Sequence, residues 1–461
     1  MSYIFVENDR VPIGNFAFIS DVTGNETLFN MFYEAEKNIK IDYMDFARKI
    51  RIAFESFAVE EEARRRKNEL ENENKELKQL KDEIIAEIDK PASILNYKNI
   101  IIDLCRNREL EFKEMLVKYS FLRKNSYDDE TIRIFQKYIR YIYSFGSESS
   151  HINMNIEEKY IPNKENCLRV AGSFHDFLCK YYHLEKKFDS TIVPIRDYIA
   201  FPKQLLDKMG MNLDVGKALF VKEESQKIRY YIFSSDIESI SKGQRRDIDT
   251  VNKLWEENFS DPSNVIRKSE RIYGSNGDYA FQVYALPGRP IKLTEAFINS
   301  ITLQDKLDII SGIYNGIVSL HSYVTPLFHR NINPDAFYIF NIHGKYKTLL
   351  AKFDCAKDTD NDAFTVLQNV EKKVNNEKTN GFFAPEVKNN KIGFNIDWEK
   401  ADIYSLAKTA FFILTGKITD NIYDVEVSKD ISEELLLTLM EMMDEDPNKR
   451  CKLTNLGEAL R

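Results

Sequence analysis

The sequence predicts a multidomain α+β protein, in which a mostly helical N-terminal half precedes a half whose strands come before its helices. The chain has 461 residues, which exceeds the usual size of one hydrophobic core. The spacing of apolar residues changes from helical to strand-like near residues 187–195, where a polar connection interrupts the pattern. Hydrophobic residues make up 43% of the chain, and this content is enough for packed domains.

Composition limits the class of function. The net charge is -8, so the chain as a whole has no basic field that would attract nucleic acid or an anionic membrane. The five cysteines are widely spaced, which predicts neither a disulfide framework nor a metal site. The sequence has no signal-peptide pattern and no long apolar run, so we expect a cytoplasmic protein without a membrane segment.

The N-terminal half is expected to contain a small β-structure and then helices. Residues 1–27 alternate apolar and polar side chains, which predicts a hairpin or edge strands, and residues 28–190 have helical periodicity. Apolar residues recur every seven positions from Ala63 to Ile84, which predicts a long helix at about 50–90. The neighbouring positions are mostly charged, so a helix packed along one stripe is favoured over an intermolecular coiled coil.

Several motifs of the second half occur in a fixed order. "HRNINPDAF" at residues 329–337 is followed by "KFDCAK", "FAPEV", "DIYSLA" and "DPNKR". In order and spacing this series resembles the catalytic loop, the D-F-G and A-P-E motifs and the closing helices of protein kinases. The resemblance implies a bilobal kinase-like domain, with an N-lobe at residues 195–290 and a C-lobe at residues 291–461.

The motif residues that support the kinase C-lobe are retained. They are His329, Arg330, Glu386, Asp402 and Arg450. In the family, the glutamate and the last arginine form a buried ion pair, and the aspartate accepts hydrogen bonds from amides of the catalytic loop. These residues predict a fold and say nothing about turnover.

The catalytic positions of the same motifs hold other residues. Asn331 occupies the position of the base, and an amide cannot accept a proton at neutral pH. Asn333 replaces the loop lysine, and Ala336 replaces the asparagine that holds a metal ion. Lys352 occupies the position of the metal-binding aspartate, where a cation would repel magnesium. Phe233 occupies the position of the phosphate-pairing lysine, so the resemblance implies a pseudokinase with no cofactor, whose ATP binding is unexpected and testable.

Two stretches of the first half resemble a bacterial group of the HEPN superfamily. "FARKIRIAFESF" matches its "A-R-x-x-x-E" helix, with Arg51 and Glu55 one helical turn apart. "YIRYIYSFGSESSHINMN" is similar to its later "R-x-x-G-N-x-x-x-H" segment, with matches at Gly146 and His151. The resemblance implies a helical domain that commonly pairs with a second copy.

HEPN ribonucleases use an arginine and a histidine near the 2′-hydroxyl of RNA. The resemblance implies a candidate site of His151 and Arg140, with Glu148 assisting. The alternative is that His151 caps a helix end while Arg140 faces solvent or pairs with an acid.

Three functions follow from these resemblances. The first is a catalytically inactive kinase-like regulatory or scaffold protein that binds a protein partner, similar in arrangement to bacterial phage-defence proteins. The second is a metal-independent ribonuclease that cleaves RNA or tRNA under control of the pseudokinase. The third is a non-phosphorylating transferase on a kinase-like fold, with Asp335, Asp354 and Asp358 as the nearby carboxylates. A homo-oligomer is expected.

Overall fold

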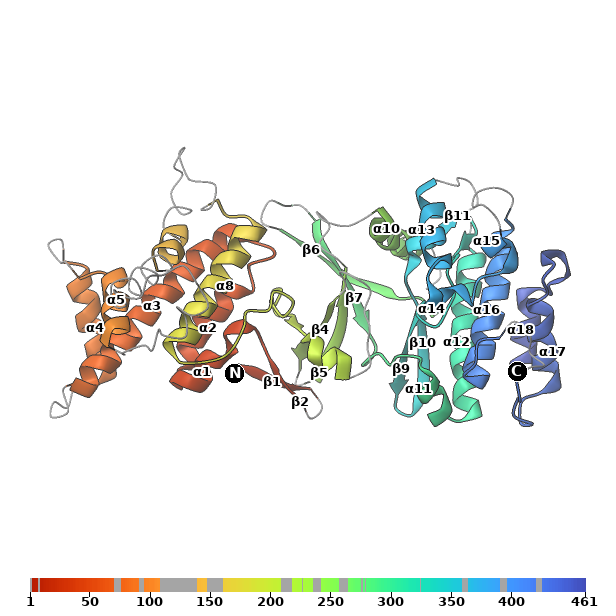
Figure 1. The fold of residues 1–461 in the computed structure, drawn as a ribbon, viewed down its shortest axis with the longest axis horizontal. Helices are drawn as coiled ribbons and strands as arrows, with labels where there is room; N and C mark the ends of the chain where they lie inside the picture. The colour runs from red at the N-terminus through yellow and green to blue at the C-terminus, as the bar shows by residue number, and fades with distance from the viewer. Residues whose placement is uncertain are drawn as a thin grey trace, which may run out of the picture. The chain divides into compact units, whose positions relative to one another are not determined.

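The fold is described from a computed structural model. It covers residues 2–6, 9–69, 76–90, 95–107, 139–146, 161–208, 218–225, 227–234, 242–256, 264–274, 277, 279–323, 325–358, 364–389, 396–419 and 425–461. The chain is a mixture of helices and strands, as predicted, and it divides into two compact units (Figure 1). Unit 1 consists of Met1–Pro202 with Gly274–Asp278, and unit 2 of Lys203–Tyr273 with Tyr279–Arg461.

Unit 1 begins with the predicted hairpin, which is shorter than expected. Strand β1 (Tyr3–Val6) pairs antiparallel with β2 (Asp9–Pro12). The prediction of β-structure up to residue 27 is wrong beyond β2, because η1 (Asn15–Ala17) and α1 (Phe18–Thr23) follow. Four consecutive apolar or aromatic residues are buried there, which a strand with one exposed face cannot achieve.

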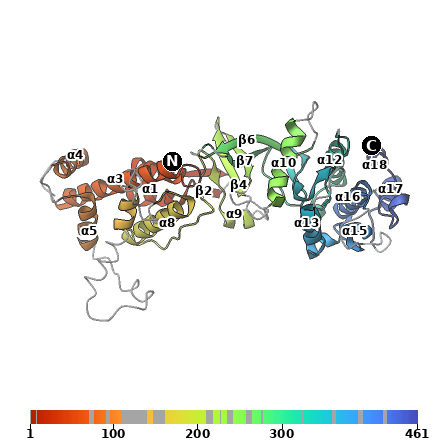
Figure 2. The same ribbon diagram turned by 90° about the horizontal axis from the view of Figure 1, so that it is seen from above.

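Five longer helices complete most of unit 1. They are α2 (Glu26–Glu36), α3 (Tyr43–Glu69), α4 (Leu77–Ile88), α5 (Tyr97–Asn107) and α8 (Lys164–Tyr181). Helices α2, α4, α5 and α8 all contact α3. Figure 2 shows three of them, α4, α5 and α8, beside α3. Buried aromatic rings fill the space between α2, α3 and α8, and they include Phe16, Phe32, Phe54, Phe57, Phe174 and Phe177. A helical segment at 139–146 and the short strand β3 (Ile199–Ala200) also belong to this unit.

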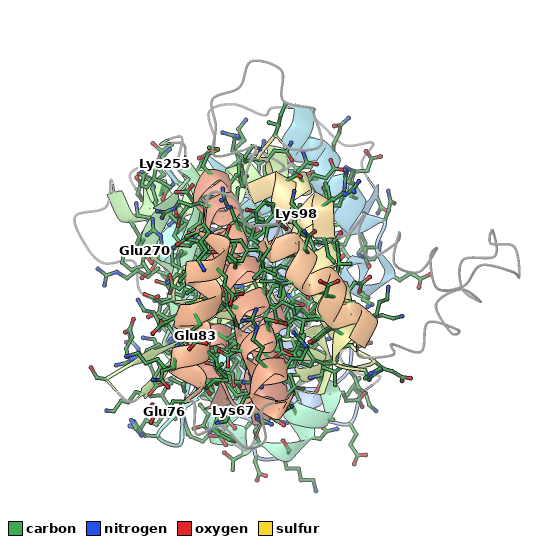
Figure 3. All side chains as sticks on the ribbon, turned by 90° about the vertical axis from the view of Figure 1, so that its left-hand side faces the viewer. Lys67, Glu76, Glu83, Lys98, Lys253 and Glu270 are labelled. Carbon is green, nitrogen blue, oxygen red and sulfur yellow. The ribbon has the colours of Figure 1, made fainter. Side chains whose placement is uncertain are left out.

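The single long helix predicted at about 50–90 is two helices. Helix α3 begins at Tyr43 and ends at Glu69, and α4 is a separate helix that packs on it. Glu76, which precedes α4, has an extended backbone. Two hydrogen bonds of 3.1 and 2.9 Å join the guanidinium of Arg66 in α3 to the carboxylate of Glu87 in α4. The charged positions beside the apolar stripe therefore connect the two helices. Figure 3 shows charged side chains along these helices, including Lys67 of α3 and Glu83 of α4.

Unit 2 contains an antiparallel sheet in the order β4-β5-β7-β6. These strands are β4 (Ala218–Glu224), β5 (Lys227–Phe233), β7 (Tyr279–Leu286) and β6 (Arg267–Tyr273). Helix α9 (Lys203–Lys208) precedes the sheet, and α10 (Lys242–Glu256) lies between β5 and β6 in sequence and contacts β6.

The rest of unit 2 is mostly helical. Its longer helices are α11 (Glu295–Ser300), α12 (Leu303–His321), α13 (Phe364–Val374), α16 (Trp398–Thr415), α17 (Glu433–Met442) and α18 (Leu453–Ala459). Two antiparallel pairs are formed by β8 (Leu327–Phe328) with β11 (Lys357–Asp358), and by β9 (Phe337–Ile342) with β10 (Lys345–Leu350). The shorter helices are η3 (Phe353–Cys355), α14 (Glu377–Asn380), α15 (Pro385–Asn389) and η5 (Pro447–Lys449).

Helices α12 and α16 form the core of this part. Helix α12 starts with a capping box of Thr302 and Asp305, and it packs on both β10 and α16. A Cβ added at Gly312 would lie 2.8 Å from the Cβ of Thr348 in β10, so the close contact requires glycine. Almost every residue of α16 is buried, including Asp402. None of the helices in the ranges given above is long and apolar enough to cross a membrane.

Candidate functional site

The carboxylate of Asp402 in α16 anchors the loop that begins at His329. Asp402 Oδ2 accepts a hydrogen bond from the backbone amide of His329 at 2.7 Å, and Oδ1 accepts one from that of Arg330 at 2.9 Å. Oδ2 also lies 3.1 Å from Nε2 of His321. Asp402 is 1% exposed, so these charge-assisted bonds form away from solvent. The bonds from Asp402 to loop amides that the sequence predicts are present.

The side chains of His329 and Arg330 are buried against neighbouring groups. Nε2 of His329 donates to the backbone oxygen of Ala351 at 2.9 Å, and burial lowers the pKa of this imidazole. The guanidinium of Arg330 lies 4.4 Å from the centre of the Trp398 ring. Arg330 has φ 61°, a left-handed conformation that costs energy for a residue with a side chain. Both residues therefore hold the loop in one conformation.

The two asparagines of the loop bond to each other. Nδ2 of Asn333 donates to the backbone oxygen and to Oδ1 of Asn331, both at 2.9 Å. Oδ1 of Asn333 accepts from the backbone amide of Asp335 at 2.9 Å. Each asparagine is 3% exposed, and Ala336 is 1% exposed. These three positions thus present no carboxylate and no ammonium group.

Segment 351–355 follows β10 and turns sharply. Lys352 has φ 63° and is 9% exposed. Asp354 in η3 forms an ion pair of 3.4 Å with Lys373 of α13, and its backbone oxygen accepts from Asn369 at 3.2 Å. The carboxylate of Asp354 is therefore already paired with a cation of the chain.

Helix α10 also binds this segment, through residues that the sequence did not indicate. Oδ1 of Asp247 accepts from the backbone amide of Phe353 at 2.7 Å, and Nη1 of Arg246 donates to the backbone oxygen of Asp354 at 3.2 Å. Asp247 is 5% exposed. More than a hundred residues separate the partners, so no local pattern could have shown this contact.

Phe233, at the end of β5, is part of an aromatic cluster. Its ring centre lies 4.2 Å from that of Phe220 in β4 and 6.0 Å from that of Phe281 in β7. Phe233 is 1% exposed. Phe233 is therefore a packing residue of the sheet and presents no positive charge.

Glu386 and Arg450 form the expected ion pair. Nη1 and Nη2 of Arg450 donate to the two carboxylate oxygens at 2.6 and 2.8 Å. The arginine side chain is fully buried, and it also donates to the backbone oxygens of Asp444 and Lys400 at 2.8 and 3.0 Å. This bidentate pair joins α15 to the chain between α17 and α18.

In unit 1, α3 and the helical segment 139–146 bring together residues of the two motifs noted in the first half of the sequence. Nε of Arg51 donates to Oε1 of Glu55 at 2.8 Å, and the Arg51 guanidinium lies 5.3 Å from the ring centre of Tyr143. A Cβ added at Gly146 would lie 2.5 Å from Cβ of Arg51 and 2.7 Å from the backbone oxygen of Ala47. Glycine is therefore required for the close packing of this segment on α3.

Of the three residues in the predicted ribonuclease site, the structure describes one. Arg140 is exposed on segment 139–146. Glu148 and His151 lie outside the described residues, so the geometry of this site stays a prediction.

A cavity of 420 Å³ adjoins the Arg51–Glu55 pair on α3. Glu55 lines it together with apolar residues such as Ile52 and Val59, and α4 contributes Lys78 and Lys81. Charges of both signs surround this cavity, and Lys81 pairs with Glu60. The cavity is thus lined by apolar side chains and by charges of both signs, and this mixture does not indicate which kind of ligand would bind.

No group of three or more His, Cys, Asp or Glu side chains that could hold a metal ion is present in the part of the chain that the structure describes. No protein-family model matches the chain, and no curated protein matches it significantly.

Proposed function

We propose that the protein is a regulatory or scaffold protein, in which unit 2 is a protein-kinase-like domain without phosphoryl-transfer activity and unit 1 is a HEPN-like helical domain. One observation carries the proposal: the loop that Asp402 anchors holds Asn331 and Asn333, whose side chains bond each other where transfer requires a base and a cation. The retained Glu386–Arg450 pair and the motif order favour a kinase-like scaffold that has lost its chemistry.

The size of the expected loss argues against a residual role in phosphoryl transfer. Removal of a single group that stabilises the developing charge typically costs roughly 3 to 4 kcal/mol. Here the base, the loop lysine, both metal ligands and the strand lysine are replaced, although such losses are not additive. The proposed role is therefore recognition of a protein partner by unit 2. Binding of this partner would then control unit 1.

Two assays on the full chain test this proposal. The first measures transfer of labelled phosphate, nucleotide or adenylate from ATP to the protein and to a general substrate. The second measures the melting temperature with ATP and magnesium. We expect no transfer and no shift, whereas transfer of any group would replace the regulatory role with a transferase.

A ribonuclease activity of unit 1 is the second candidate. It is favoured by the packing of Gly146 on Arg51, since Gly146 lies two residues before Glu148 and five before His151 in the sequence. The protein would then cleave RNA without a metal ion. His151→Ala should abolish cleavage and Arg140→Ala should weaken it, whereas His183→Ala, at an exposed position after α8, should have no effect.

The biological setting belongs to the same proposal. A fusion of a nuclease-like helical domain with a degenerate kinase-like domain resembles bacterial phage-defence proteins, which is an argument from fold analogy. The five free cysteines fit a reducing cytoplasm. Light scattering after gel filtration measures whether the chain forms the expected homo-oligomer.

A further inference from the structure

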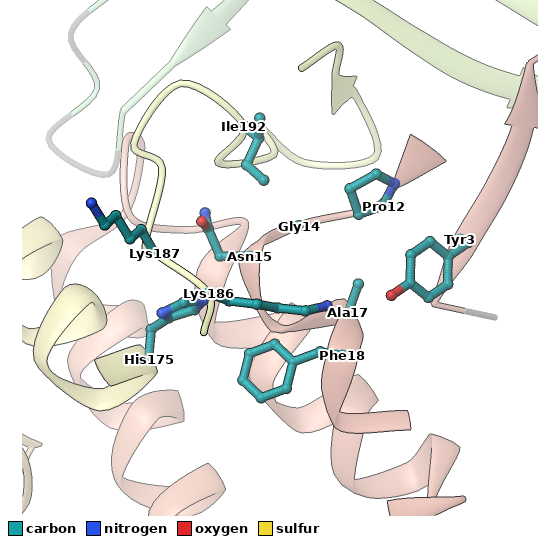
Figure 4. A pocket seen from close by; sticks show the side chains of 10 residues that line it. All are labelled: Tyr3, Pro12, Gly14, Asn15, Ala17, Phe18, His175, Lys186, Lys187 and Ile192. Carbon is teal, nitrogen blue, oxygen red and sulfur yellow. The ribbon is translucent and has the colours of Figure 1, made fainter. Parts of the chain in front are cut away.

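A second cavity of unit 1 lies where the N-terminal hairpin, α1, α8 and the segment after α8 meet (Figure 4). Its volume is 280 Å³, close to the lower end of the range of about 300 to 1,000 Å³ that is usual for small-molecule sites. Its residues come from positions that are more than 150 residues apart in the chain, so the folded unit is needed to form it.

The walls of this cavity are mainly apolar. Pro12, Ala17 and Ile192 line it together with the ring of Phe18. Ala17 and Phe18 are each 2% exposed. The ring of Phe18 packs edge to face on the imidazole of His175, with their centres 5.3 Å apart. A ligand inside would therefore contact carbon atoms over much of its surface.

Lysine side chains line one part of the cavity. Lys186 and Lys187 both line it, and the ammonium of Lys186 lies 5.5 Å from the centre of the Phe18 ring (Figure 4). The backbone amide of Lys186 hydrogen-bonds the thiol of buried Cys179, which fixes where this side chain begins. Figure 4 shows the Lys186 side chain extending across the cavity toward Ala17, whereas the Lys187 side chain points away from it, so Lys186 supplies the cation of the pocket.

The carboxylate of Asp21, which interacts with Lys186, is occupied elsewhere. Asp21 interacts with Lys186 at a distance, but its Oδ1 accepts from Arg10 at 2.9 Å and its Oδ2 from the hydroxyl of Tyr3 at 2.6 Å. Within the described ranges, neither Lys186 nor Lys187 has a carboxylate at salt-bridge distance. The ammonium of Lys186 is thus not held by a carboxylate of the described residues and can pair with an anionic ligand.

A buried polar group also faces the cavity. His175 lines it and is 1% exposed, and among the described residues the thiol of Cys179 is the hydrogen-bond partner of its ring nitrogens, at 3.7 and 3.9 Å. Burial and Lys186 lower the pKa of His175 to about 4, so the ring is neutral near pH 7 and offers one N–H donor. A buried donor without a strong acceptor points to an acceptor that enters from outside.

We propose that this cavity binds a small organic anion, in which a carboxylate or phosphate group is joined to an apolar body. The anionic group pairs with Lys186, and the apolar body lies against Ala17, Phe18 and Ile192. This site is independent of the function proposed above, because none of its residues belongs to either predicted catalytic site.

Titration calorimetry on the full chain tests the site with three probes: benzoate, adenosine 5′-monophosphate and inorganic phosphate. We expect benzoate or the nucleotide to bind, and either result supports the proposal and identifies the anionic group. Lys186→Gln should weaken this binding at least about tenfold, because a hydrogen bond to a charged group is lost. Lys90→Gln, which removes an exposed lysine elsewhere in unit 1, should leave it unchanged.

A second variant tests the cavity itself. Ile192→Trp places a large ring in the space while both lysines remain, and it should abolish binding without changing the circular dichroism spectrum. The proposal is refuted if neither organic probe binds, or if Lys186→Gln binds as tightly as the wild type. It is also refuted if inorganic phosphate binds as tightly as the organic probes, because the apolar walls would then contribute nothing.

Discussion

Replacement of Glu36 by glutamine should change how the stability of unit 1 depends on pH. The carboxylate of Glu36 lies at the end of α2 and is 1% exposed. Its Oε1 accepts from the backbone amide and from Nδ2 of Asn15, at 2.9 and 2.7 Å, at the start of η1. Burial is the largest influence on this carboxyl and raises its pKa from 4.5 to about 7.

The sign and size of the effect follow from this difference in pKa. The folded protein binds the proton of Glu36 more tightly than the unfolded chain does, so the stabilising contribution is complete below pH 4.5. It is lost as the pH rises through about 7. At about 1.4 kcal/mol per pH unit, the interval from 4.5 to about 7 corresponds to roughly 3 kcal/mol. Because the amide of a glutamine at this position cannot titrate, Glu36→Gln should gain stability relative to the wild type by up to this amount as the pH rises from about 5 to about 8.

Urea unfolding at several pH values measures this difference. Circular dichroism follows the helices of both units, whereas tryptophan fluorescence follows unit 2, which contains Trp255 and Trp398. Glu165→Gln is the matched control, because that side chain is 83% exposed and its replacement should shift the free energy of unfolding by less than about 0.5 kcal/mol. If the wild type and Glu36→Gln lose stability in parallel across this pH range, the assignment of a raised pKa to Glu36 is wrong.

Three further substitutions test the packing of both units. Arg450→Ala leaves Glu386 without its cation and should destabilise unit 2 by roughly 3 to 5 kcal/mol by tryptophan fluorescence, whereas Lys449→Ala at a neighbouring exposed position should have little effect. Gly146→Ala should destabilise unit 1 by about 1 to 3 kcal/mol, because the added Cβ would lie 2.5 Å from Cβ of Arg51. Gly172→Ala is the control and should be neutral or stabilising, because its added Cβ would lie 3.6 Å from the nearest atom, in the ring of Phe188. Asn333→Ala removes the bonds to Asn331 and to the amide of Asp335, and should cost about 1 to 3 kcal/mol in urea unfolding. An unchanged midpoint for any of these three would show that the described contact is not formed in solution.

The mixture of helices and strands could be predicted because periodicity and capping are local properties. The division of the predicted long helix could not. Ala63 and Ile84 are both fully buried, as the seven-residue pattern requires, but burial of each position does not show whether one helix continues between them. The return of α4 onto α3 depends on contacts such as Arg66 with Glu87, 21 residues apart.

The sequence pattern also did not predict that three consecutive glutamates of α3 are buried. Glu60, Glu61 and Glu62 are consecutive and each at most 5% exposed, whereas a run of acids normally marks a solvated face. They are buried because partners come from several elements: Lys81 from α4 binds Glu60, and the hydroxyls of Tyr181 and Tyr182 donate to Glu61 at 2.9 and 3.0 Å. Such a network exists only in the folded unit.

In the candidate site of unit 2, the sequence likewise predicted which residues matter but not which residues they contact. Motif order pointed to Asn331, Asn333 and Lys352, but it could not show that the side chains of the two asparagines bond each other. It also gave no sign that Asp247 binds the amide of Phe353 from another helix. The identity of a substituted residue can thus be read from the chain, whereas its new partner cannot.

These contacts bear on the function proposed for unit 2, because Asn333 and Phe233 make contacts that a lysine at either position could not make. A lysine at position 333 has no acceptor for the amide of Asp335, which now bonds Oδ1 of Asn333. A lysine at position 233 would place a charge where the Phe233 ring lies 4.2 Å from that of Phe220. Restoring a catalytic group would therefore remove a contact that stabilises the fold. The fold of unit 2 thus depends on Asn333 and Phe233 themselves, which supports the proposal of a kinase-like domain without phosphoryl-transfer activity.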